Sequence, residues 1–326
     1  MKVLVLGGAG YIGSHMCKYL SEQGHEVVVF DNLSTGHAEA VKWGVLVKGD
    51  ILNQADLDML FEIHGRFDLI MHFCAKSLVG ESVQQPAIYY KNNVVGTLNV
   101  LDTMVKTGHD KLVFSSTAAV FGMPQVNLID EKQPRRPINP YGQTKKMVED
   151  ILQDYHQAYG LKSVCLRYFN ACGADPECEV GECHQPETHL IPNVLKSVNN
   201  ASSAKLKVFG NDYPTADGTC VRDYIHINDL ATAHIKAGLY LDNHDGAYAF
   251  NLGNGNGFSV LQVINAAMAV VGEDIAFDIE ARRQGDPAIL VADASLAIKQ
   301  LGWQPKYTDI TDIIATAWQW HQNEKF

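Results

Sequence analysis

The sequence contains no hydrophobic run long enough to cross a membrane, no low-complexity tract and no internal repeat. A membrane-spanning helix needs about 20 consecutive apolar residues. The start, MKVLVLGGAG, is interrupted by glycines too early for a signal peptide. Hydrophobic residues make up 46% of the 326 positions, and the 19% of charged residues are mixed along the chain. We therefore expect a folded protein with a large core and neither a membrane span nor a disordered domain.

Positive charge is scarce. Lys and Arg total 26 against 37 Asp and Glu, which gives a net charge of −11. This balance argues against nucleic acid or an anionic membrane as the main partner, although a local basic pocket for a phosphate remains compatible with it. Seven cysteines form no disulfide framework, so a reducing cytoplasm is expected.

Paired C-x-x-C motifs are also absent. A cluster within eighteen residues nevertheless contains potential zinc ligands, namely Cys172, Cys178, Cys183, His184 and His189. Because structural zinc sites favour closely paired cysteines, this spacing predicts no metal.

Apolar runs alternate with helical patterns through the first half of the chain. We expect strands at 3–6, 26–30, 45–47, 69–74, 112–116 and 163–169, and helices at 11–23, 55–63, 86–105 and 141–159. Such alternation implies right-handed crossovers and a doubly wound parallel sheet with both faces covered, an α/β fold.

The order changes near residue 171, where a loop rich in Gly, Pro and charge leads into mixed elements. We predict a dinucleotide-binding domain at 1–170 with a returning segment at about 222–253. A smaller mixed α/β substrate domain, interleaved with the first, is expected at 171–326.

The motif GGAGYIG follows the first strand and opens the first helix. Its Gly7, Gly10 and Gly13 allow backbone N–H groups and a helix N-terminus to approach a pyrophosphate. Asp31 lies 18 residues after Gly13 with no arginine beside it, so its carboxylate is expected to accept from a ribose hydroxyl and repel a 2′-phosphate. NAD is thus favoured over NADP. An ordinary tight turn and a capping aspartate are the structural alternatives.

Two further strand ends are expected at the carboxyl edge of the sheet, where such folds bind ligands. Asp50 and Ile51 follow one strand and are placed near an adenine. Cys74, Ala75 and Lys76 end the next, where Lys76 is either a cofactor or phosphate contact or a solvated loop charge.

The stretch NPYGQTKK places Tyr141 and Lys145 one helical turn apart on one face. By spacing alone this is an ordinary exposed pair. However, the strand LVFSS ends at the same sheet edge with Ser115, Ser116 and Thr117, so both groups can converge on one site.

Taken in order, the motifs show a specific resemblance over essentially all 326 residues. They are GGAGYIG, FDNLSTGH, GDI, FSSTAAVFG, NPYGQTK, RYFNACGA, FGNDYPTADGTCVRDYIHI and RRQGDP. The chain resembles the extended short-chain dehydrogenase/reductase family and, within it, the UDP-glucose 4-epimerases, also called UDP-galactose 4-epimerases. The resemblance implies a Rossmann-type fold, tightly bound NAD, a UDP-sugar substrate and a homodimer formed through the helix at 86–105 and the helix bearing Tyr141.

In this resemblance Tyr141 is the catalytic base and Lys145 binds the nicotinamide ribose and lowers the pKa of the tyrosine. Thr117 supplies the hydroxyl partner, where the family commonly has serine. The implied reaction is reversible epimerisation at C4 through a transient 4-keto sugar. Related 4,6-dehydratases carry an acid and a base where this chain has Ala118 and Ala119, which disfavours dehydration.

The resemblance also assigns binding residues. The cofactor set is Gly7, Gly10, Tyr11, Ile12, Gly13, Asp31, Asn32, Ser34, Thr35, Asp50, Ile51, Cys74, Ala75, Lys76, Asn92, Ser115, Tyr141, Lys145 and Tyr168. The substrate set is Lys76, Thr117, Tyr141, Asn170, His189, Leu190, Phe209, Arg222, Tyr224, Arg283, Asp286 and Leu290.

Four positions in the substrate set bear on the choice of ligand. The guanidinium groups of Arg222 and Arg283 match phosphate oxygens. At His189 the family often has asparagine. Leu290 stands where some members place a bulky tyrosine against the 2-substituent of the sugar, so UDP-N-acetylhexosamines are expected as additional substrates.

Two alternatives remain open. One is an epimerase of UDP-pentoses. The other is a non-catalytic NAD-binding sensor or scaffold of the same fold.

Overall fold

The computed structural model describes residues 1–198, 205–283 and 286–326. Seven parallel strands form the main sheet in the order β11-β7-β5-β4-β1-β2-β3. Their bounds are β1 (Lys2–Leu6), β2 (Glu26–Asp31), β3 (Val45–Lys48), β4 (Leu69–His72), β5 (Lys111–Ser115), β7 (Lys162–Tyr168) and β11 (Ala247–Leu252). The order proceeds outward in both directions from the β1–β4 pair, which makes this pair the switch point where doubly wound sheets bind ligands.

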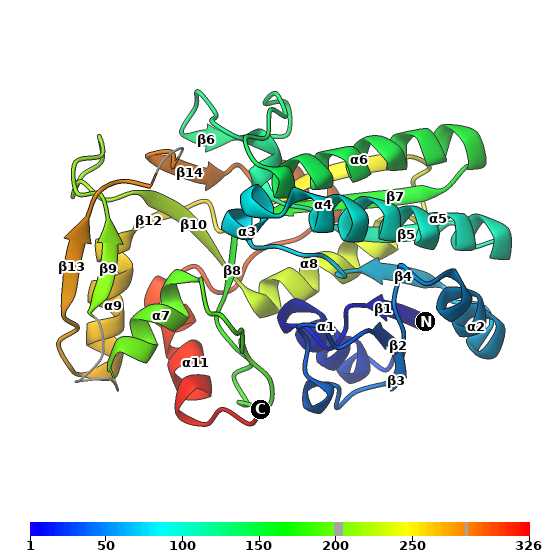
Figure 1. Cartoon of the computed structure of the whole chain (residues 1–326), viewed down its shortest axis with the longest axis horizontal. Helices are drawn as coiled ribbons and strands as arrows, with labels where there is room; N and C mark the ends of the chain where they lie inside the picture. The colour runs from blue at the N-terminus through cyan, green and yellow to red at the C-terminus, as the bar shows by residue number, and fades with distance from the viewer. Residues whose placement is uncertain (199–204, 284–285) are drawn as a thin grey trace.

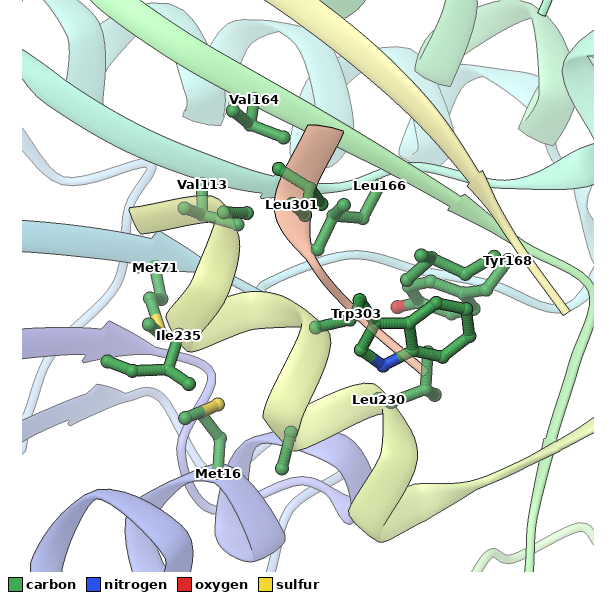
Figure 2. Packing of buried hydrophobic residues seen from close by; sticks show 14 of the residues in the cluster. Met16, Met71, Val113, Val164, Leu166, Tyr168, Leu230, Ile235, Leu301 and Trp303 are labelled. Carbon is green, nitrogen blue, oxygen red and sulfur yellow. The ribbon is translucent and has the colours of Figure 1, made fainter. Parts of the chain in front are cut away.

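Helices cover both faces of this sheet, because successive side chains of a buried strand point to opposite sides. Val3 and Val5 belong to one apolar core with α1 and α8, whereas Leu4 and Leu6 belong to another with α2, α5 and α6. Figure 2 shows the first core, where Met16 of α1 and Ile235 of α8 lie near Met71 of β4. The helix bounds are α1 (Tyr11–Glu22), α2 (Gln54–His64), α5 (Gly96–Thr107), α6 (Pro140–Tyr159) and α8 (Ile227–Tyr240).

The expected helix at 86–105 is interrupted. It consists of α4 (Pro86–Tyr89), a π-helical turn at Tyr90–Val95, and α5, and the short α3 (Val79–Gln84) precedes it. Two 3₁₀ turns, Ala38–Ala40 and Ala118–Phe121, follow β2 and β5. Strand β4 ends at His72, so the expected strand end Cys74–Lys76 lies in the loop beyond it.

A second, smaller part lies at the carboxyl edge of the main sheet (Figure 1). Its mixed sheet has the order β12-β10-β14-β6, with β8 also paired to β10, and a separate pair joins β9 to β13. These strands are β6 (Leu128–Ile129), β8 (Asn170–Cys172), β9 (Leu206–Phe209), β10 (Val221–His226), β12 (Gly257–Ser259), β13 (Phe277–Glu280) and β14 (Ile289–Ala292). Its helices are α7 (Leu190–Val198), α9 (Val260–Val271) and α11 (Ile310–Gln322), whereas α10 (Ser295–Leu301) packs against α8 and β11 in the first core of the main sheet.

The architecture confirms the expected α/β class, a doubly wound parallel sheet with a smaller mixed α/β part. The predicted returning segment 222–253 is divided between the two parts: β11 joins the main sheet and α8 packs against it, whereas β10 is central to the second sheet. Within the described ranges, no helix combines the length and the apolar character that crossing a membrane requires.

Candidate functional site

The glycine turn between β1 and α1 has the close backbone packing that a dinucleotide site needs. A Cβ at Gly13 would lie 2.1 Å from the carbonyl oxygen of Gly7, and Gly7 itself has φ +84°. At Gly10 an added Cβ would meet only that same carbonyl, at 3.5 Å, so this side of the turn is open. No side chain caps the start of α1. The open turn and the uncapped N–H groups fit a pyrophosphate.

Asp31 ends β2 beside this turn, as predicted. Its Oδ2 accepts from the N–H of Ala9 at 3.0 Å and its Oδ1 from the N–H of Leu33 at 2.8 Å. Burial raises the pKa of Asp31, and these two backbone hydrogen bonds oppose the rise. Each carboxylate oxygen keeps a further lone pair, which fits acceptance from a ribose hydroxyl.

The loop after β4 carries Lys76 and is held by a residue that the sequence analysis did not select. Asn93 accepts from the N–H of Lys76 at 2.9 Å, donates to the Lys76 carbonyl at 3.0 Å and donates to Thr144 Oγ1 at 3.1 Å. The neighbouring Asn92, a predicted cofactor residue, donates to Asn93 at 3.0 Å. Asn93 therefore connects the Lys76 loop to α6.

Helix α6 brings Tyr141 and Lys145 to the end of β5. Its N-cap Asn139 accepts from the N–H of Gly142 at 2.8 Å, which fixes the first turn. Lys145 is 2% exposed, its Nζ donates to the carbonyl of Ser115 at 2.6 Å, and it lies 4.6 Å from the ring centroid of Phe114. The structure therefore joins the helix and the strand end as predicted.

The electrostatics of this pair are set mainly by burial. Burial lowers the pKa of Lys145 to about 7, against the opposing effects of Cys165, Cys74 and Glu149. Burial also raises the pKa of Tyr141, and a hydrogen bond with Thr117 opposes that rise. The phenol and the threonine hydroxyl thus form one polar group inside an apolar surround.

A buried ion pair stabilises the end of β5. Arg167 donates from Nε and Nη2 to the two oxygens of Glu149, at 2.9 and 2.6 Å, and Ser116 donates to Glu149 at 2.5 Å. Ser115 shares a hydrogen bond with the Tyr168 hydroxyl. Because Ser116 is anchored, the adjacent Thr117 is held in place.

A cavity of about 510 Å³ lies in the second part. Eight predicted substrate residues line it: Asn170, His189, Leu190, Phe209, Arg222, Tyr224, Arg283 and Asp286. Arg222 pairs with Asp286, and the guanidinium of Arg283 lies 4.1 Å from the ring centroid of Phe209. The lining also includes residues that were not predicted from the sequence, among them Glu182, Thr188, Asn193, Lys196, Lys207 and Cys220.

Leu290 is not among the residues lining that cavity. It lies on β14 opposite Arg222 of β10 and packs against Val120, Phe121 and Ile129. This apolar cluster begins at Val120, three residues after Thr117.

Comparison with known proteins identifies the family of this chain. Residues 3–253 match the model of the NAD dependent epimerase/dehydratase family. The chain belongs to this family. The UDP-glucose 4-epimerase of Halalkalibacterium halodurans is 49% identical over 322 residues, which cover 99% of this chain and 96% of that protein.

Solved structures of this epimerase/dehydratase family superpose closely. The Brucella ovis UDP-glucose 4-epimerase in complex with NAD is 48% identical, with a TM-score of 0.94, covering 98% of this chain and 97% of its own. The Bifidobacterium longum UDP-glucose 4-epimerase in complex with NAD+ and UDP is 37% identical, with a TM-score of 0.93 and coverage of 99% of both chains. Full-length coverage means that both parts of the fold are shared.

Proposed function

We propose that this protein is a UDP-glucose 4-epimerase, an isomerase that interconverts UDP-glucose and UDP-galactose with bound NAD. The observation that carries the proposal is the convergence of Tyr141, Thr117 and Lys145 at the carboxyl edge of the sheet that also bears the glycine turn. The neighbouring part adds a cavity with Arg222 and Arg283. The names and bound molecules of the relatives agree with this activity.

NAD, when bound, supplies a hydride acceptor that can return the hydride to either face of a 4-keto sugar. The chain supplies proton transfer and orientation. Tyr141 takes the proton of the sugar 4-hydroxyl and later returns it, while Thr117 orients the phenol and the reacting oxygen. No net oxidation results, because the proton that leaves the 4-hydroxyl and the hydride that leaves C4 both return.

Lys145 meets the electrostatic demand of this role. A tyrosine base near neutrality needs its pKa lowered by about three units, or roughly 4 kcal/mol. One positive charge about 4 Å away at an effective dielectric of about 20 contributes on the order of 4 kcal/mol. The hydrogen bond with Thr117 opposes the upward effect of burial on the pKa of Tyr141, and we propose that the charged form of Lys145 lowers this pKa further.

The cavity is proposed to hold the uridine diphosphate. Arg222 and Arg283 present guanidinium donors to the phosphates, and Asp286 orients Arg222. Phe209, stacked under Arg283, offers an aromatic surface to the uracil. Lys76, Asn170, His189, Leu190 and Tyr224 complete the proposed contacts.

The test is conversion of UDP-galactose to UDP-glucose by purified protein without added NAD, followed by chromatography. We expect turnover in the wild type. In the variant Tyr141→Phe, kcat should fall by a factor of about 10³, while NAD released on denaturation stays at the wild-type amount. Full activity of Tyr141→Phe would refute the catalytic role, and bound NAD without turnover in the wild type would favour the sensor or scaffold.

A second substrate class is favoured by Leu290. Leucine leaves more room than tyrosine beside an apolar cluster, which suits the 2-acetamido group of a UDP-N-acetylhexosamine. We expect Leu290→Tyr to lower kcat/KM for UDP-N-acetylgalactosamine more than for UDP-galactose. Failure of the wild type on both N-acetyl sugars, beside normal galactose conversion, would reject this extension.

We also infer a homodimer and a cytoplasmic location. The segment from the π-helical turn through α5 exposes Tyr90, Val95 and Val105, and an apolar row on helices beside α6 suits a helix-to-helix interface. All seven cysteines are free thiols, which suits a reducing compartment.

A further inference from the structure

Figure 1 shows the course of the loop between β8 and α7. Two imidazoles and two carboxylates from this loop lie close together. The Nδ1 of His189 lies 2.5 Å from Glu182 Oε1 and 3.3 Å from Glu187 Oε1. The Nδ1 of His184 lies 3.1 Å from Glu182 Oε1 and 3.9 Å from Glu187 Oε2. One ligand atom from each of the four residues lies within 4.8 Å of all the others.

These separations resemble the edges of a metal coordination tetrahedron. Four ligands at about 2.1 Å from a zinc ion are separated from one another by about 3.4 Å. The separations that involve Glu182 Oε1 or Glu187 Oε2 are 2.5, 3.1 and 3.9 Å, on either side of that value. With both imidazoles neutral, as coordination through nitrogen requires, the four groups carry a charge of about −2, which a divalent ion neutralises.

The carboxylate of Glu187 gives a second, independent indication. The Glu187 side chain is only 5% exposed. Its Oε1 accepts from the N–H groups of Thr188 and His189, at 2.7 and 2.8 Å, whereas its buried Oε2 has no hydrogen-bond partner. Because a buried carboxylate oxygen without a partner is costly, an oxygen directed into this cluster points to a ligand.

The nearby cysteines are engaged elsewhere. The thiols of Cys172, Cys178 and Cys183 donate to the carbonyls of Ile225, Gln319 and Phe326, at 3.3 to 3.4 Å. The expectation from the sequence grouped these cysteines with the two histidines, but the structure joins the histidines to glutamates instead.

A neighbouring acidic group shows what a cluster satisfied by the chain itself looks like. Asp175, Glu177 and Glu179 surround the Nζ of Lys18 at 2.8, 2.6 and 3.1 Å. That group already contains its cation, a lysine, whereas the histidine and glutamate cluster keeps an oxygen without a partner.

We propose that Glu182, His184, Glu187 and His189 form a binding site for one divalent transition-metal ion of the zinc class. On binding, each imidazole releases any Nδ1 proton to solvent and coordinates through that nitrogen. The ion fixes the loop that supplies Glu182, Thr188 and His189 to the wall of the 510 Å³ cavity. This proposal goes beyond the epimerase reaction and needs no metal in the chemistry.

The experiment uses the full-length protein stripped with a chelator and then supplied with Zn²⁺ alone or Co²⁺ alone. After gel filtration, elemental analysis should find about one zinc ion per chain. The Co²⁺ form should show the intense visible absorption of tetrahedral cobalt. Wild-type protein that retains neither ion would overturn the proposal.

Variants separate this site from adventitious binding. Glu187→Gln keeps the shape and an amide oxygen for the two backbone N–H groups, and we expect its affinity for zinc to fall by at least about tenfold. His184→Ala should lose the tetrahedral cobalt spectrum. Cys183→Ser, in the same loop but outside the cluster, serves as the matched control and should bind like the wild type. Equal zinc binding by Glu187→Gln, His184→Ala and wild type would refute the assignment.

Discussion

Lys145 shows how a single buried residue connects stability with catalysis. Its ammonium is nearly removed from solvent and its pKa falls to about 7, so the fold disfavours the charge that the proposed mechanism uses. The carbonyl of Ser115 accepts one of its N–H groups and the ring of Phe114 faces it, which partly offsets the lost hydration. Burying Lys145 is therefore expected to lower the free energy of unfolding of the protein.

The first prediction is a pH dependence of stability that Lys145→Met removes. In the unfolded chain the lysine keeps its proton up to about pH 10.4, whereas in the folded chain it loses the proton near pH 7. The unfolded state thus binds more protons between these values, and the free energy of unfolding should rise with pH there. We expect a rise of about 1 kcal/mol per pH unit from this group.

Urea unfolding of wild type and Lys145→Met between pH 7 and 9 measures this difference. Subtracting the two curves removes groups common to both proteins. If the free energies of unfolding of the two proteins change in parallel with pH, the pKa of Lys145 is not lowered in the native state.

The second prediction concerns the hydroxyl at position 117. Thr117 is hydrogen-bonded to Tyr141, and its Oγ1 also accepts from the N–H of Ala119 at 3.1 Å. Thr117→Val keeps the shape but removes the hydroxyl, so kcat should fall by about 10²-fold. Thr117→Ser keeps the hydroxyl and should retain most of kcat. If both variants have the same kcat, the hydroxyl has no catalytic role.

At the scale of elements, the turn between β1 and α1 contains a glycine, Gly10, that we expect to be needed for ligand access and not for packing. Gly10 has φ −82°, which any residue adopts, and an added methyl would make an ordinary contact at 3.5 Å. The third prediction is that Gly10→Ala leaves the unfolding midpoint of the NAD-free protein nearly unchanged but lowers NAD retention by about tenfold, because the methyl occupies the proposed pyrophosphate side.

Gly80→Ala is the matched control for this substitution. An added Cβ at Gly80, in α3, would meet nothing within 4 Å. NAD bound per chain after gel filtration is the measurement. Wild-type retention in Gly10→Ala would place the cofactor elsewhere.

The main sheet could be predicted because most of its strands are buried apolar runs between helical patterns; β3, at the edge of the sheet, is the exposed exception. Val3 to Leu6 and Glu26 to Phe30 carry that pattern locally. The second sheet was not resolved from sequence, because strands of two to four residues, such as β6 and β14, show no periodicity. The proposed site divides in the same way. Tyr141 and Lys145 lie in a motif that resembles one of a known family, although their spacing alone is not specific, whereas the support from Asn93 depends on pairings far along the chain.

At the scale of the whole molecule, one buried carboxylate connects the two sheets. Asp223 of β10 accepts from the N–H groups of Asn254 and Gly255, just after β11, and of Ala292 on β14. Burial raises the pKa of Asp223 to about 6, against these three hydrogen bonds. The connection holds the proposed nucleotide cavity against the sheet edge that carries Tyr141, so that a single bound sugar nucleotide can reach both.

The last prediction concerns the assembly of two such molecules. Tyr90 and Val95 are 37% and 46% exposed on the π-helical turn that precedes α5, and α6 contacts this turn. If two copies pack these helices together, the double variant Tyr90→Arg/Val95→Arg places four buried charges in the interface and should dissociate it, because unpaired buried charges cost several kcal/mol.

Sedimentation of the wild type should give twice the chain mass, and the variant should give the chain mass. Ile279→Arg, at a site 51% exposed on β13 in the other part of the molecule, is the control and should remain dimeric. A wild type that sediments as a monomer, or a double variant that stays dimeric, would contradict this interface. Because α6 also carries Tyr141 and Lys145, a monomeric variant should show reduced activity only if the partner stabilises that helix.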